Sequence, residues 1–163
     1  MKQLLVVRHA KSSWDFSSMN DFDRPLNDRG HRDAPMMAKR LLHKQISIDA
    51  FISSTAKRAF TTATYFAEAY ELKEKNIIRV PELYHAAASV FYNVITKVDD
   101  EFNTIAVFSH NPGISEFVNE LTDASIDNMP TCGIFAVTVH ADTWKDFITA
   151  KKDFWFFDYP KSI

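Results

Sequence analysis

Arginine and histidine residues stand at the ends of three short apolar runs in this sequence. Arg8 and His9 directly follow LLVV, His110 directly follows the run that ends at Ser109, and Arg58 comes a few residues after FISS. A guanidinium binds phosphate oxygens in a bidentate manner and keeps its charge. A neutral imidazole can attack phosphorus and form a phosphohistidine, which divides a transfer into two steps. These residue types therefore predict phosphoryl-transfer chemistry.

The chemistry of each group suggests its role. We expect Arg8 and Arg58 to hold a phosphoryl group from two sides, with Arg58 in the first turn of a helix whose N–H groups also favour an anion. One histidine would attack, and a second would stabilise the charge that develops on the equatorial oxygens. A carboxylic acid could protonate a poor leaving oxygen, and Glu82, which follows another apolar run, is the candidate.

Short runs of strand type alternate with longer segments of helical periodicity. The expected strands are 3–8, 49–54, 77–80, 104–109, 133–140 and 152–158, and the expected helices are 27–44, 55–70, 89–102 and 112–122. Asn27 fits the N-cap of the first helix. Pro35 must either kink this helix or mark its true start near Asp33.

The alternation of strands and helices predicts βαβ units and an α/β fold with a largely parallel central sheet flanked by helices. Strands 3–8 and 104–109 lack polar alternation, as expected for strands that are buried on both faces. In such sheets ligands bind outside the carboxyl ends of the strands. Two arginines, two histidines and one carboxylate follow strand ends here, so we expect the fold to gather them at one edge.

The composition bounds the remaining possibilities. With 163 residues, 46% of them apolar and 25% charged, the chain fits one globular domain over residues 1–163. The net charge of −2 argues against a nucleic-acid partner. The single cysteine, Cys132, suits a reducing compartment, and we expect it to be a small buried residue. Without a signal peptide or a bilayer-length apolar run, we expect a cytoplasmic protein with no membrane partner.

Cofactor motifs are absent from the sequence. With only 3 glycines there is no GxGxxG and no Walker loop, which removes the usual nucleotide-binding interpretations. No HxH, HExxH or CxxC spacing is present, and two arginines beside the site would repel a cation. We therefore expect neither a metal nor another cofactor.

Five motifs together resemble the histidine phosphatase superfamily, and within it the small SixA-type phosphohistidine phosphatases. They are RHAKSSW at 8–14, RPLNDRG at 24–30, SSTAKRAFTTA at 53–63, PEL at 81–83 and SHNPGI at 109–114, in family order. The resemblance covers the chain from residue 3 to about residue 120. It implies the three-layer α/β sandwich of phosphoglycerate mutase-like proteins and a metal-independent phosphatase activity.

The resemblance also implies roles for individual residues. His9 would be the phosphorylated nucleophile, Arg8 and Arg58 would hold the phosphate, and His110 would be the second histidine of the phosphate pocket. Ser12 stands where many relatives have a threonine or serine near the phosphate. A hydroxyl that caps a turn is the alternative for Ser12.

Two acidic residues depart from a simple family pattern. Asp15 stands where the mutase branch has an asparagine. Glu82 falls near the glutamate that acts as acid or base in the mutase branch, whereas SixA-type members are thought to manage without a dedicated acid. Glu82 could instead be a loop carboxylate paired with Arg79 or Lys57, and His85 could donate the proton in its place.

Three functions remain open from the sequence. The first is dephosphorylation of phosphohistidine on a protein such as a phosphotransfer domain, since the chain has no room for the insertions that roof the pocket in mutases and acid phosphatases. A leaving imidazole can carry a proton on its far nitrogen, so this reaction needs an acid less than ester hydrolysis does. The second is hydrolysis of a small phosphorylated metabolite or sugar phosphate, and the third is a non-catalytic phosphate-binding module.

The loop after His9 contains four large apolar residues, Trp14, Phe16, Met19 and Phe22. These residues could belong to the core, or they could form an apolar rim that receives a protein partner.

Overall fold

A six-stranded sheet forms the middle layer of the computed structural model, which describes residues 1–14 and 20–161. Its strands are β1 (Lys2–Arg8), β2 (Ala50–Ser53), β3 (Ile78–Arg79), β4 (Thr104–Ser109), β5 (Ile134–Val139) and β6 (Lys152–Asp158). They lie in the order β3-β2-β4-β1-β5-β6. Neighbours among β1 to β4 are parallel, whereas β5 runs antiparallel to β1 and β6 antiparallel to β5.

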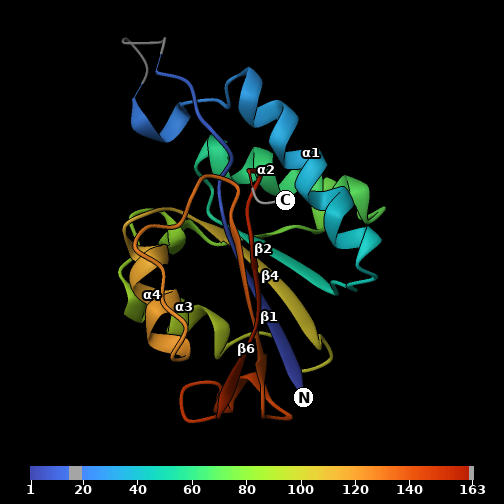
Figure 1. Ribbon diagram of the computed structural model, residues 1–163, viewed down its shortest axis with the longest axis vertical. Helices are drawn as coiled ribbons and strands as arrows, with labels where there is room; N and C mark the ends of the chain where they lie inside the picture. Colours follow the sequence, from blue (N-terminus) through green and yellow to red (C-terminus); the bar gives the residue numbers. More distant parts are fainter. Residues whose placement is uncertain (15–19, 162–163) are drawn as a thin grey trace.

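Helices cover both faces of the sheet (Figure 1). The α-helices of the described residues are α1 (Asp28–His43), α2 (Lys57–Ala69), α3 (Ala88–Ile95) and α4 (Gly113–Leu121). Figure 1 shows α1 and α2 on one side of the strands and α3 and α4 on the other. The expected three-layer α/β sandwich with a mostly parallel central sheet is thus confirmed.

The apolar run of β1 is buried on both faces because its side chains alternate between two cores. Leu4 and Val6 pack into the core under α3 and α4, while Leu5 and Val7 pack into the core under α1 and α2. All four side chains are fully buried, which stabilises the fold by about 1.5–3 kcal/mol for each. The strand that ends at Arg8 is therefore held firmly at the centre of the sheet.

The first helix does not start near Pro35, which was one of the two alternatives expected from the sequence. The helix begins at Asp28, with the Asn27 side chain accepting the Gly30 N–H at 2.9 Å, and it continues through Pro35 to His43. A start near Asp33 was therefore wrong. Pro35 removes one helical hydrogen bond, but the apolar face that includes Ala34, Met37 and Leu41 is buried and outweighs this loss.

Two other elements are shorter than their sequence patterns indicate. α3 ends at Ile95 rather than near residue 102, and the residues that follow it include a turn in which the Asp99 carboxylate accepts the Glu101 N–H. β3 contains only Ile78 and Arg79, both exposed at the edge of the sheet. The strands expected at 104–109 and 152–158 have the expected ends.

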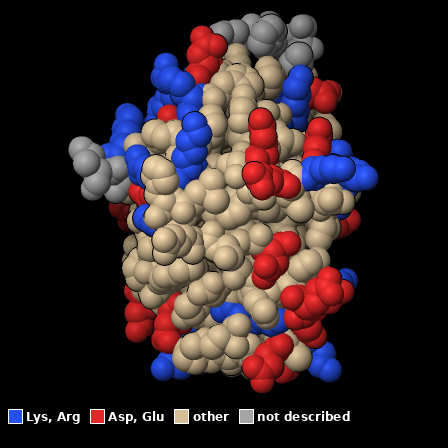
Figure 2. All heavy atoms as spheres, turned by 90° about the vertical axis from the view of Figure 1, so that its right-hand side faces the viewer, with Lys and Arg blue, Asp and Glu red and all other residues tan. Residues whose placement is uncertain are grey.

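Charges of both signs lie on the surface of the molecule. Figure 2 views the side that faces right in Figure 1, where Lys and Arg side chains gather mainly at the upper left and Asp and Glu lie mainly at the centre, right and bottom. A broad band of uncharged residues separates many of them. Of the helices that the structure describes, none is long and apolar enough to cross a membrane.

Candidate active site

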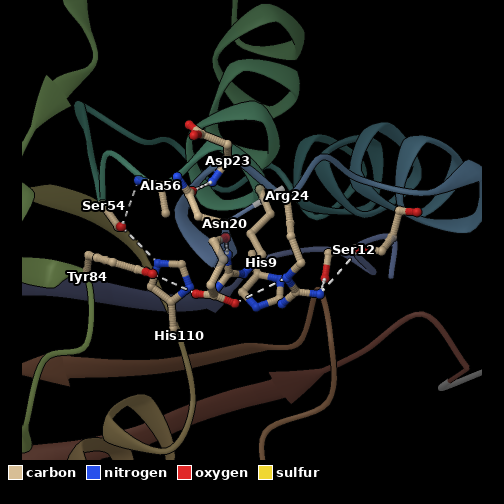
Figure 3. Close-up of polar contacts among 12 residues, drawn as sticks. His9, Ser12, Asn20, Asp23, Arg24, Ser54, Ala56, Tyr84 and His110 are labelled. Carbon is tan, nitrogen blue, oxygen red and sulfur yellow. Dashed lines mark hydrogen bonds and ion pairs between the residues drawn. The ribbon is translucent and has the colours of Figure 1, made fainter. Parts of the chain in front are cut away.

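The two histidines predicted for the site meet at the carboxyl ends of two neighbouring strands. Arg8 of β1 pairs with Ser109 of β4, so His9 and His110, the next residue of each strand, lie side by side. Their ring centroids are 5.2 Å apart, and each residue is only 5% exposed. Figure 3 shows the two rings facing a common space. The parallel register alone brings together two residues that lie about a hundred positions apart in the sequence.

The hydrogen bond of His9 determines which ring nitrogen is free. Nδ1 lies 2.7 Å from the carbonyl oxygen of Ala10. A carbonyl oxygen can only accept, so Nδ1 carries the proton and donates it in this bond. Nε2 then keeps its lone pair, which is the electron pair that a nucleophile needs.

The surroundings of His9 and His110 keep both rings neutral at ordinary pH. Burial lowers the pKa of His9 well below its usual value; the hydrogen bond to Ala10 raises it in part, and the neighbouring His110 and the positive charges of Arg8 and Arg58 lower it further. Burial and the positive charge of Arg58 lower the pKa of His110 to about 3. A neutral His9 is available for attack without prior loss of a proton.

His110 contacts Ser54 through one ring nitrogen and has no partner for the other in the described structure. Its Nε2 lies 2.8 Å from Oγ of Ser54, which in turn accepts the N–H of Ala56. When the Ser54 hydroxyl donates to Nε2, the neutral ring carries its proton on Nδ1. That Nδ1 is buried and has no hydrogen-bond partner in the described structure. It is therefore a free donor for an incoming oxygen.

Each of the two arginines also has one buried N–H donor, its Nε–H, that has no partner in the described structure. Arg8 donates through Nη1 to the carbonyl oxygen of Met129 at 2.8 Å, and Arg58 donates through both terminal nitrogens to Asp21. The Nε of each arginine is buried and has no partner among the described residues. A buried donor without a partner is unfavourable. The described residues thus hold three such donors, the two Nε atoms and Nδ1 of His110.

Thr62 fixes the helix that carries Arg58 against the strand end that carries His9. Its Oγ1 accepts the N–H of Ala10 at 2.9 Å and donates to the Arg58 carbonyl at 2.8 Å. Thr62 is fully buried, so water does not compete for these bonds. The backbone next to the nucleophile and the first turn of α2 are thus joined by one hydroxyl.

The short 3-10 helix Asp21–Asp23 supplies Asp21, a residue that the sequence did not single out. The Asp21 carboxylate accepts hydrogen bonds from Arg58, from the Tyr84 hydroxyl at 2.7 Å and from Nε of Arg24 at 3.1 Å. Burial raises the pKa of Asp21, but the hydrogen bonds from Tyr84 and Arg58 outweigh it and lower the pKa to about 2. A cation in the first turn of a helix calls for an anionic partner, and for Arg58 that partner is Asp21.

A match to a known family accompanies this geometry. Residues 4–86 match the model of the histidine phosphatase superfamily (branch 1). The chain belongs to this superfamily. Its resemblance in sequence to histidine phosphatases is thereby confirmed. Membership of this superfamily supports a phosphatase activity for the protein.

Relatives of this histidine phosphatase are found among both sequences and structures. An uncharacterized chloroplastic protein of Arabidopsis thaliana is 31% identical over 153 residues, which cover 89% of this chain and 70% of that protein. Phosphoserine phosphatase 1 of Hydrogenobacter thermophilus is 32% identical over 108 residues, 63% of this chain and 49% of that protein. The structure of the protein histidine phosphatase SixA complexed with tungstate shares the fold, with a TM-score of 0.82, 22% identity and coverage of 97% of each chain.

The structure brings Arg8, His9, Arg58 and His110 into one cluster, as expected for a histidine phosphatase. Ser12 is buried nearby, but its Oγ accepts a hydrogen bond from Nη1 of Arg24 at 3.0 Å. Figure 3 shows Ser12 and Arg24 on the side of His9 away from Tyr84. The hydroxyl of Ser12 thus orders Arg24, and its contact with phosphate stays a prediction.

No hydrogen bond or ion pair between Glu82 and this cluster is found among the described residues, and its role as an acid stays a prediction. Glu82 is exposed and lines a hollow of about 600 Å³ together with residues of β2, β3 and α3. Within the described residues it makes no ion pair with Arg79 or Lys57. His85, in contrast, lines a hollow of about 270 Å³ together with His110.

The loop after His9 is described only in part. Trp14 is 73% exposed, and Cζ of the Arg24 guanidinium lies over its ring, 3.5 Å from the ring centroid. Phe22 is 37% exposed and packs edge-on against Tyr84. These two side chains lie at the surface rather than in the core. Asp15, Phe16 and Met19 lie outside the described residues.

Proposed function

We propose that this histidine phosphatase hydrolyses phosphohistidine on a protein substrate, without a metal, through a phosphorylated His9. The observation that carries the proposal is the His9 ring, with Nδ1 committed to the Ala10 carbonyl, Nε2 left with its lone pair, the His110 ring 5.2 Å away and the charges of Arg8 and Arg58 close enough to lower the pKa of His9. Tungstate, an oxyanion, is bound by the SixA protein that shares this fold.

In the first step the lone pair of His9 Nε2 attacks phosphorus. The Nε2–P bond forms as the bond between phosphorus and the leaving group breaks, and the leaving group takes the bond's electron pair. The Nδ1 proton stays in its hydrogen bond to Ala10, where the carbonyl oxygen stabilises the positive charge that develops on the ring. Arg8, Arg58 and His110 donate to the phosphoryl oxygens, and each well-placed donor contributes about 3 kcal/mol to transition-state stabilisation.

In the second step water attacks the phosphorylated His9. A new O–P bond forms, the Nε2–P bond breaks, and Nε2 recovers its lone pair while a proton of the water passes to the phosphate or to solvent. His9 leaves as a neutral ring, the form that its buried surroundings favour. Inorganic phosphate is released, and the nucleophile is ready for another cycle.

The carboxyl groups near the site favour phosphohistidine over an ester. Asp21 has a pKa of about 2 while it is bound to Tyr84 and Arg58, so it carries no proton to give at neutral pH. Glu82 is exposed and makes no hydrogen bond or ion pair with the site residues that the structure describes. An alkoxide leaving group needs an acid, whereas an imidazole that is protonated on its far nitrogen leaves as a neutral ring.

A phosphate ester of a small metabolite is the second candidate substrate. One relative carries the name phosphoserine phosphatase, and His85 lines a hollow beside His110 where a leaving oxygen could receive a proton. Under this alternative His85 takes the role of the acid, as an imidazole can near neutral pH.

A comparison of substrates tests the proposal. The protein is assayed for phosphate release from a phosphohistidine-containing protein, from phosphoserine and from an aryl phosphate, as wild type and as Glu82→Gln, His85→Gln and His9→Ala. We expect kcat/KM to be highest for the phosphohistidine protein and Glu82→Gln to change no rate by more than about twofold. His9→Ala should abolish all turnover.

The other outcomes distinguish the alternatives. Faster turnover of phosphoserine, with a selective loss in His85→Gln, would favour the ester phosphatase. A larger loss on esters than on phosphohistidine in Glu82→Gln would restore Glu82 as the acid. Phosphate binding with no release from any of the three substrates would indicate a non-catalytic module.

A further inference from the structure

Asp21 takes one N–H donor from each terminal nitrogen of Arg58. Nη1 of Arg58 donates to the Asp21 backbone carbonyl oxygen at 2.6 Å, and Nη2 donates to Oδ2 of the Asp21 carboxylate at 3.0 Å. Arg58 is 5% exposed, whereas the Asp21 side chain is 41% exposed, so these contacts are only partly buried. Each terminal nitrogen keeps a second N–H, and the buried Nε has no partner in the described structure.

A guanidinium binds phosphate most strongly through two parallel hydrogen bonds. With Asp21 in place, two of the five N–H donors of Arg58 are already taken, one on each terminal nitrogen. A phosphoryl group next to an ionised Asp21 would also be repelled by it, and the low pKa of Asp21 keeps it ionised throughout the neutral range. The carboxylate and the phosphate therefore compete for one cation.

We propose that Asp21 is a built-in competing anion of the phosphate site, which the incoming phosphoryl group replaces on Arg58 and which returns to Arg58 when phosphate leaves. The proposal rests on the proposed function only in that the pocket takes phosphate. It makes Asp21 a residue that lowers the affinity for the inorganic phosphate product and so favours its release.

The structure provides a place for the displaced carboxylate. Oδ2 of Asp21 also accepts the Tyr84 hydroxyl at 2.7 Å, and Oδ1 accepts from Nε of Arg24 at 3.1 Å. The Asp21 side chain is 41% exposed, so water can replace the contact with Arg58. A movement of the Asp21 side chain can therefore free Nη2 of Arg58, whereas Nη1 keeps its bond to the Asp21 backbone carbonyl.

Titration of inorganic phosphate by calorimetry tests the proposal without any need for turnover. Wild type is compared with Asp21→Asn and with the matched control Asp23→Asn, at one pH and one ionic strength. Asp23 belongs to the same short helix and carries the same charge, but its carboxylate makes no contact with Arg58.

We expect the dissociation constant of phosphate to fall by about tenfold or more in Asp21→Asn, since a charge-assisted hydrogen bond no longer opposes binding. Asp23→Asn should stay within about twofold of wild type. An unchanged or weaker affinity in Asp21→Asn would overturn the proposal. So would an equal gain in both variants, which would indicate a general charge effect, or the absence of phosphate binding from all three proteins.

A crystal structure of wild type with inorganic phosphate gives a second test that does not depend on a variant that folds. Phosphate bound to Arg58, with the Asp21 carboxylate moved away from Nη2, is the expected result. Phosphate in the pocket with the Asp21–Arg58 contact intact would overturn the proposal. If no phosphorylated substrate is turned over while Asp21→Asn binds phosphate more tightly, the proposed function fails and this inference stands.

Discussion

Replacing Thr62 by valine should loosen the connection between the two halves of the active site. Valine has nearly the shape of threonine and the same branching at Cβ, so helix propensity and packing change little. The change removes the hydroxyl that accepts from Ala10 and donates to the Arg58 carbonyl. Because Thr62 is fully buried, the N–H of Ala10 is left without a partner and without access to water.

The structure allows the size of the effect to be worked out. One buried donor that loses its partner costs about 1–3 kcal/mol, so we expect the free energy of unfolding to fall by about 2 kcal/mol. In a domain of this size that corresponds to a decrease of roughly 4–8 °C in the melting temperature. We also expect kcat/KM to fall by about tenfold, since Arg58 and His9 lose their common support and a small misplacement reduces transition-state binding.

Thermal and urea unfolding, together with kinetics on the preferred substrate, measure both effects. Thr64→Val is the matched control, because the Thr64 hydroxyl donates only to the Thr61 carbonyl of the same helix. Thr62→Ser keeps the hydroxyl and should restore most of the activity. Equal losses of stability and activity in Thr62→Val and Thr64→Val would refute the reasoning.

Three further predictions concern pH, packing and metal. Burial is the main reason why the pKa of His110 is lowered to about 3 and that of His9 well below its usual value. Below about pH 6.5 these two histidines therefore bind more protons in the unfolded chain than in the folded chain. Stability should therefore fall as the pH drops from about 6.5 toward 3, by up to about 1.4 kcal/mol per pH unit for each histidine; urea unfolding that does not change over this range would contradict the assignment of neutral rings. Gly113→Ala should destabilise the protein by at least about 2 kcal/mol in urea unfolding, because a Cβ there would lie 1.8 Å from the Ala86 carbonyl oxygen, and a variant as stable as wild type would show that this segment can move aside. EDTA should leave the rate of phosphate release unchanged; strong inhibition that added divalent metal reverses would point to a metal site.

The central cluster could be predicted from the sequence because its members are fixed by strand ends. Arg8, His9 and His110 directly follow apolar runs, and parallel topology places the ends of such runs together. Arg58 could be predicted in the same way, since only a short turn separates β2 from the first turn of α2. In these cases local sequence and sheet topology are sufficient.

The supporting residues could not be predicted in this way, because tertiary packing alone brings them to the site. Asp21 lies in a short 3-10 helix with no apolar periodicity, and Thr62 is one of several threonines and alanines on α2. Tyr84 follows PEL, but no local pattern indicates that its hydroxyl reaches Asp21. The end of α3 was misplaced for a related reason, since apolar residues continue at helical spacing into the turn that Asp99 begins.

The way the pocket is assembled also bears on how the protein acquires its activity during folding. The hydrogen bond from Arg8 to Met129 joins residues 121 positions apart, the one from Ala10 to Thr62 spans 52 positions, and the one from Arg58 to Asp21 spans 37. Contacts between such distant segments close large loops and form late, after local helices are in place. Recovery of activity on refolding should therefore lag behind the recovery of helical circular dichroism and report the last stage of folding.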